Sequence, residues 1–134
     1  MPLTLEIVTP ERRVVAPTAC DEVRAPGAQG GFGIRPRHAP FMSALEPGRL
    51  TYLAGGQEHH FAVGGGVLQV ADDKVLVLAD TAEEREEIDV ERAQRAFQEA
   101  SERLRALAEQ DEQHPVEAAR VRRAAARLHV AGKP

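Results

Sequence analysis

The sequence predicts an α+β fold in which an antiparallel β-sandwich or barrel precedes a pair of helices. In the first 80 or so residues, short apolar runs each end at Gly, Pro or Asp, which is typical of strands joined by turns. From residue 82 onward no Gly occurs until Gly132, and Ala, Glu, Arg, Leu and Gln dominate, all of which favour helix. We therefore expect a sandwich domain over residues 1–84 and a helical hairpin over residues 85–134.

Six segments of the first half have strand character. LTLEIVTP (3–10) alternates apolar and polar side chains, as a half-buried strand does. The others are CDEVRAPG (20–27), RLTYLAGG (49–56), EHHFAVGGG (58–66), VLQVADD (67–73) and KVLVLAD (74–80). VADDKV places a turn between the last two runs and predicts a hairpin. Because KVLVL is apolar at both alternating positions, we expect that strand to be covered on both faces.

The second half has the period of helices. One apolar stripe comprises Ala93, Ala96, Phe97, Ala100, Leu104, Leu107 and Ala108. After the polar break AEQDEQHPV, Pro115 suits the start of a second helix. Its predicted stripe comprises Ala118, Val121, Ala125 and Leu128. The short break predicts an antiparallel hairpin. Since Ala-rich stripes bury little area, we expect the hairpin to be able to move off the sandwich.

Composition limits the cell compartment and the kind of partner. Cys20 is the only cysteine, so no intrachain disulfide forms, and a reducing compartment is expected. No apolar stretch approaches the roughly 20 residues of a membrane span, and no signal peptide is evident. The net charge is −4, yet residues 116–134 carry five basic side chains against Glu117. That tail suggests an anionic partner, with a solvated helix face as the simpler alternative.

The segment GGFGIRPRHAP (30–40) is glycine-rich but lacks the Lys-Ser or Lys-Thr of a phosphate-binding loop. An enzyme centred on His38, with Arg35 and Arg37, would lack a paired acid, base or metal cluster. A local turn that holds His38 by hydrogen bonds is the structural expectation. A nucleic-acid-binding barrel that uses the basic tail would lack an aromatic stacking platform.

Several segments resemble one family in the same order and at nearly the same spacing. GGFGIRPRHAPFMSALEPG (30–48) resembles the GxxGILPGHAPLxxxLxxG segment of the epsilon subunit of the F-type ATP synthase. LEIVTPER (5–12), VRAPGAQGGFGI (23–34), FAVGGGVLQVADDKVLVLAD (61–80), EEIDVERAQRA (86–96) and AARLHVA (125–131) are similar to further segments of that family. Arg37 replaces the usual Gly of PGHAP, and Gly66-Val67 replaces Gly-Phe.

The resemblance implies a ten-stranded antiparallel sandwich followed by a two-helix hairpin. It implies a non-catalytic rotor subunit in the central stalk of a proton-translocating enzyme, at the cytoplasmic face of the cell membrane, which it reaches only through the complex. The sandwich would bind the gamma subunit and the c-ring, and the hairpin would restrain ATP hydrolysis and contact the beta subunit when extended. The alternative is a stand-alone nucleotide-binding or nucleic-acid-binding β-barrel module with a basic helical tail.

The resemblance also implies site residues. No cofactor is required, and no nucleic acid is expected as a partner. Partner contacts are expected at His38 and at Arg120, Arg123 and Arg127, which share one side of the last helix.

IDVERA (88–93) is similar to an I(L)DxxRA motif through which some epsilon subunits bind regulatory ATP. The implied ATP site comprises Glu83, Ile88, Asp89, Arg92, Ala93, Arg123 and Arg127. Glu99 stands where ATP-binding members carry another arginine. Independently of the resemblance, Asp89 is a good N-cap for the first helix.

Overall fold

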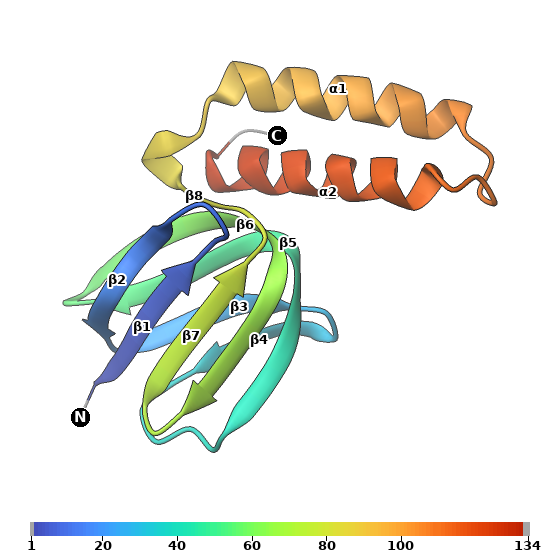
Figure 1. The fold of residues 1–134 in the computed structure, drawn as a ribbon. Coiled ribbons are helices and arrows are strands. Elements are labelled where there is room, and N and C mark those ends of the chain that lie inside the picture. Colours follow the sequence, from blue (N-terminus) through green and yellow to red (C-terminus); the bar gives the residue numbers. More distant parts are fainter. Residues whose placement is uncertain (1, 133–134) are drawn as a thin grey trace.

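A computed structural model describes residues 2–132, in which a β-sandwich carries a helical hairpin at one end (Figure 1). The strands are β1 (Leu3–Val8), β2 (Arg13–Cys20), β3 (Glu22–Gly27), β4 (Gly30–Ile34), β5 (Phe41–Ala54), β6 (Gln57–Ala71), β7 (Lys74–Ala79) and β8 (Ala82–Glu84). The helical elements are the short 3-10 helix η1 (Arg85–Glu87), α1 (Val90–Ala106) and α2 (His114–Val130). The predicted α+β class and order of elements are confirmed.

The strands pair in the order β2-β1-β7-β6-β5-β3-β4, and β8 pairs with β6. Two details differ from expectation. The described residues form eight strands rather than ten, because β5 and β6 run as one long pair from Phe41↔Val70 to Ala54↔Gln57 and each counts once. The sheet is also not wholly antiparallel, because β1 pairs with β7 in parallel. This pairing joins strands from the two ends of the sandwich sequence, so no local sequence pattern predicts it.

Alternation along the strands builds the core. Leu3, Leu5 and Ile7 of β1 are fully buried, as predicted, and meet Val75 and Val77 of β7. The predicted hairpin between β6 and β7 is confirmed: its two turn residues, Asp72 and Asp73, both have positive φ, at 51° and 59°.

One expectation for β7 is wrong within residues 2–132. Val75 and Val77 face the core, but Leu78 on the other face is 49% exposed. Nothing else in the described part of the chain covers that face of the strand fully, so a partner has to cover it if it is to be buried at all.

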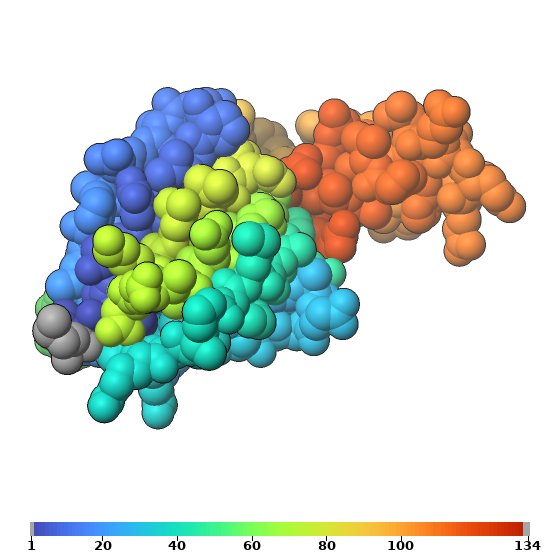
Figure 2. All heavy atoms as spheres, turned by 60° about the horizontal axis from the view of Figure 1, so that its bottom comes forward, coloured from blue at the N-terminus to red at the C-terminus, as the bar shows by residue number. Residues whose placement is uncertain are grey.

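In the hairpin, α2 lies between α1 and the sandwich, where it contacts β5 and β6 (Figure 1). Figure 2 shows the two helices projecting from one side of the sandwich. The predicted α1 stripe is confirmed at Ala93 and Ala100, which are buried. The predicted α2 stripe is confirmed in part: Leu128 is buried and Ala118, Val121 and Ala125 are half-buried, but other residues are buried as well because α2 is covered on two sides. Its buried residues are Glu117, Ala124, Ala126, Leu128 and Val130.

Candidate functional site: a cleft at the start of α1

A cleft of about 500 Å³ lies where α1 begins beside the sandwich. Five of the seven residues expected to form an ATP site line it: Glu83, Asp89, Arg92, Ala93 and Arg127. The remaining two, Ile88 and Arg123, are not among its lining residues. Residues from β8, α1 and α2 that are far apart in sequence therefore meet at one place.

Asp89 sets the geometry of the cleft by ending the linker and starting the helix. Its backbone is extended, with φ −82° and ψ 99°, and its Oδ1 accepts a hydrogen bond of 3.1 Å from the N–H of Arg92. The predicted N-cap is therefore confirmed. The cap fixes the first turn of α1, which places Arg92 and Ala93 on the wall of the cleft.

Two ion pairs are formed between residues that line the cleft. The Nε of Arg127 on α2 donates to Oε1 of Glu83 on β8, and both side chains are about 30% exposed (28% and 31%). In the second pair, Arg12 donates to both carboxylate oxygens of Glu87 at 3.0 Å. The backbone N–H of Glu84 and the Arg12 guanidinium lower the pKa of Glu87 below its ordinary value of 4.5. These pairs tie α2 and η1 to the sandwich domain.

The cleft carries more negative than positive charge. Its acidic lining residues are Glu11, Asp80, Glu83, Glu87 and Asp89, and its basic ones are Arg12, Arg92 and Arg127. Within residues 2–132, Arg92 makes no ion pair, whereas the other two arginines are bound to carboxylates. A phosphate chain could bind here if Arg127 exchanged Glu83 for phosphate oxygens, or if a metal ion offset the carboxylates.

The three arginines expected to form one basic face of α2 lie in different surroundings. Arg120 is exposed and donates to Glu117 at 2.7 Å. Arg123 is half-buried, with its Cδ against Gly64 of β6. Arg127 is held by Glu83. The docked hairpin therefore presents only part of this face to solvent.

Glu117 is a structural residue that the sequence patterns did not single out. It is 5% exposed and lies 2.7 Å from Arg120 and 3.1 Å, through its Oε2, from Arg103 of α1. It thus joins the two helices at the end far from the sandwich. The one signal in the sequence was its isolation, since it is the only acidic residue in the basic tail.

His38 lies in a local turn, as expected. Its Nδ1 is 2.7 Å from the carbonyl oxygen of Ala39, and its ring centroid is 5.6 Å from that of Phe41. The preceding Arg37 has φ 68°, a conformation that glycine adopts without strain, and its N–H donates to Asp73 Oδ1 at 2.6 Å. Within residues 2–132, no three His, Cys, Asp or Glu side chains gather as a metal site.

None of the helices in that same range is long and apolar enough to cross a bilayer.

Comparisons with known proteins agree with this architecture. Residues 2–85 match the family described as the beta-sandwich domain of the ATP synthase delta/epsilon chain, and residues 86–132 match its long alpha-helix domain. The chain is 69% identical to the ATP synthase epsilon chain of Anaeromyxobacter sp. (strain Fw109-5), over 99% of this chain and 100% of the relative. It is 49% identical to that of Myxococcus xanthus (strain DK1622), over 96% and 94%.

The fold also recurs in a solved structure. A chain in the cryo-EM structure of the Euglena gracilis mitochondrial ATP synthase, OSCP/F1/c-ring, aligns with a TM-score of 0.81 at 21% identity, over 97% of this chain and 81% of that one. At this identity the match shows the shared fold. Taken with the two domain matches and the bacterial relatives, the sandwich and hairpin show that the chain belongs to the ATP synthase delta/epsilon chain family, as an epsilon subunit of the bacterial F-type enzyme and hence a non-catalytic subunit of that membrane-bound complex.

Proposed function

We propose that the chain is a rotor subunit of the central stalk of a proton-translocating ATP synthase, which couples the c-ring to the catalytic head. The sandwich binds the gamma subunit and the c-ring, and the hairpin restrains ATP hydrolysis. The subunit works at the cytoplasmic face of the cell membrane, where the complex holds it. A second solved chain of the same fold, from the central stalk/c-ring of the Tetrahymena thermophila mitochondrial ATP synthase, supports this position, with a TM-score of 0.66 at 16% identity over 100% of this chain and 98% of that one.

An exposed apolar row on the sandwich carries the docking part of the proposal. Val8, Leu78, Val67 and Ala44 are direct register partners across β1, β7, β6 and β5. Leu76 and the exposed Met42 lie in the next register row, on either side of the exposed Gln69, and complete an outer apolar patch of six residues. Contiguous apolar area on four neighbouring strands is typical of a protein interface. We therefore assign the outer apolar patch to contact with the gamma subunit.

Leu78→Glu tests this assignment. Placing a charge where a leucine would be buried should weaken binding of the full chain to a gamma-containing subcomplex about tenfold or more, measured by calorimetry. Val116→Glu is the matched control, because Val116 is 41% exposed but lies on α2. Equal affinity of Leu78→Glu and the unchanged chain would show that gamma binds elsewhere.

The regulatory part rests on how the hairpin is docked. Its ties include the Arg127–Glu83 ion pair to β8 of the sandwich and, within the helical part, the hydrogen bond of 2.7 Å from Arg85 Nε in the η1 linker to the carbonyl oxygen of Val130. Such partly solvated ties are individually weak, so the hairpin can exchange between docked and extended states. In the extended state, Arg120, Arg123 and Arg127 would be available to an acidic segment of the beta subunit. Adding the full chain to a catalytic head depleted of it should lower ATP hydrolysis; an unchanged rate would remove the regulatory role.

The cleft supports ATP as a regulatory ligand of the docked state. Arg92 lines it without an ion pair among residues 2–132, and Arg127 can exchange a carboxylate for phosphate. Titration of the full chain with ATP, with and without Mg²⁺, should show binding that Arg92→Ala abolishes. Arg95→Ala is the control, since Arg95 lies on α1 outside the cleft. Without binding at millimolar ATP, IDVERA would act only as a helix start.

A further inference from the structure

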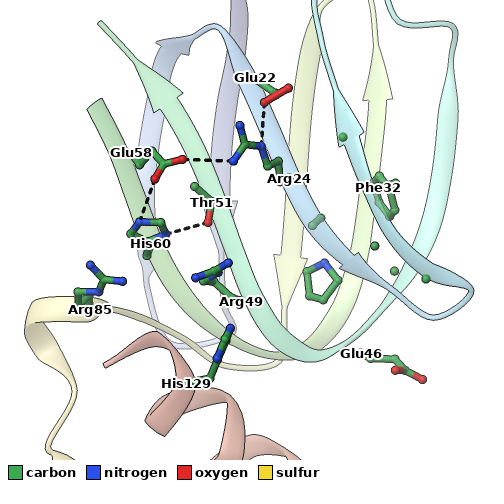
Figure 3. Close-up of a pocket in the computed structure, with 16 residues that line it drawn as sticks. Glu22, Arg24, Phe32, Glu46, Arg49, Thr51, Glu58, His60, Arg85 and His129 are labelled. Carbon is green, nitrogen blue, oxygen red and sulfur yellow. Dashed lines mark hydrogen bonds and ion pairs between the residues drawn. The ribbon is translucent and has the colours of Figure 1, made fainter. Parts of the chain in front are cut away.

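A second cavity lies at the junction of the sandwich with the end of α2 (Figure 3). This junction groove has a volume of about 1030 Å³ and shares no lining residue with the cleft at the start of α1. Its end nearest the hairpin is formed by Arg49 of β5, His60 of β6, Arg85 of η1 and His129 in the last turn of α2. Four elements thus bring nitrogen-bearing side chains to one place.

Three of these side chains have hydrogen-bond donors that no residue within 2–132 accepts. Neither Arg49 nor His129 makes a side-chain hydrogen bond or an ion pair to any residue within 2–132. Arg85 uses its Nε on the carbonyl oxygen of Val130, which leaves its two terminal nitrogens open. Figure 3 shows the three side chains around a common space beside His60.

Among residues 2–132, none of the carboxylates that line the junction groove is paired with Arg49, Arg85 or His129, although Glu58 Oε1 lies 3.7 Å from Nε2 of His60. Glu22 and Glu58 both bind Arg24, at 2.9 and 3.2 Å. Glu46 lies at the far end and points away from Arg49 (Figure 3). The groove therefore has a local excess of positive charge at the junction although its formal charges balance overall.

The imidazole of His60 lies beside the two arginines of the junction groove (Figure 3). Its Nδ1 lies 2.9 Å from Thr51 Oγ1, and its pKa is lowered first by burial and then by the charges of Arg85 and Arg49. Both arginines thus lie near the same imidazole, as Figure 3 shows. An anion bound between the two arginines would offset their mutual repulsion.

We propose that the junction groove binds a phosphate group between Arg49, Arg85 and His129. Arginine forks suit phosphate oxygens, and a tetrahedral anion can accept from donors that approach from three directions, whereas a carboxylate offers two oxygens in one plane. The bound phosphate bridges the sandwich, the η1 linker and the last turn of α2. It therefore favours the docked hairpin from a place separate from the ATP cleft.

Orthophosphate titration of the full chain, followed by amide NMR shifts at constant ionic strength, tests the proposal. Shifts are expected around the three named residues, and Arg49→Gln should weaken the binding about tenfold or more. His129→Gln, a second variant at an exposed position, should weaken it as well. Arg122→Gln is the control, because Arg122 is an exposed arginine of α2 outside both cavities, and it should bind as the unchanged chain does.

A second arm uses vesicles that contain phosphatidic acid and distinguishes a lipid headgroup from the free ion. Binding in either arm that is lost in Arg49→Gln supports the site and identifies the source of the phosphate. Absence of shifts in both arms overturns the proposal. So does phosphate binding that survives Arg49→Gln and disappears in Arg92→Gln, since the anion would then occupy the other cleft.

Discussion

Glu117→Gln tests what holds the two helices together. The substitution removes a charge that is 5% exposed and serves two arginines, Arg103 at 3.1 Å and Arg120 at 2.7 Å. Breaking a wholly buried pair costs several kcal/mol, but both arginines here are about half exposed (51% and 50%) and can be rehydrated. We therefore expect the helical hairpin to lose about 1–2 kcal/mol, which lies between the values for buried and surface pairs.

Native-state hydrogen exchange measures this loss for each part of the chain separately. Amide protection in α1 and α2 should fall about 5- to 30-fold, while the strands keep their protection. Glu112→Gln is the matched control, because Glu112 is exposed in the connection between the helices. If the amides of α1 and α2 were equally protected in Glu117→Gln and Glu112→Gln, the reasoning would be refuted. A loss of protection centred on the strands would show that Glu117 acts on the sandwich instead.

Three further predictions follow from individual contacts. Arg123→Ala combined with Arg127→Ala should relieve inhibition of ATP hydrolysis and weaken ATP binding together; loss of one effect alone, in paired hydrolysis and titration assays, would contradict a shared set of cations. Arg37→Gly should raise the thermal midpoint by a few degrees, because φ 68° strains any residue with a Cβ; a lower midpoint by calorimetry would contradict this. The pKa of Glu87 in the folded chain lies below its ordinary 4.5, so Glu87 contributes its full stabilisation above pH 4.5 and loses it as the pH falls through the folded pKa. Glu87→Gln should therefore flatten the acid part of the curve of stability against pH. An unchanged acid slope would show that Arg12 and the backbone N–H of Glu84 do not stabilise the Glu87 carboxylate.

The parts of the fold that follow from neighbouring residues could be predicted from the sequence. Alternation in β1, the turn at Asp72 and Asp73 and the cap at Asp89 each depend on a few adjacent positions, and each is observed. The parallel pairing of β1 with β7 depends on where distant segments meet, so no periodicity could predict it. The α2 stripe was incomplete for a related reason, because a helix enclosed on two sides also buries residues off a single stripe.

The two candidate sites also differ in how far the sequence predicts them. The motif IDVERA and the arginines of α2 were visible as sequence patterns, and the folded chain brings five of the seven implied residues to one cleft. The junction groove was not predicted, since Arg49, Arg85 and His129 come from three elements and stand in no recognisable spacing. Only the docking of α2 on β5 and β6 brings them together.

The position of α2 between α1 and the sandwich has a consequence for the order of folding during synthesis (Figure 1). The sandwich is complete once β8 has left the ribosome, but α1 emerges before the helix against which it packs. Its stripe at Ala93, Phe97 and Ala100 stays unpaired until α2 has also been synthesised. Val130, fully buried in the final turn of α2, completes that packing. A nascent chain therefore passes through a stage with a folded sandwich and an unpaired amphipathic helix α1. A chaperone or an early-binding subunit would bind the exposed apolar stripe of α1 at this stage.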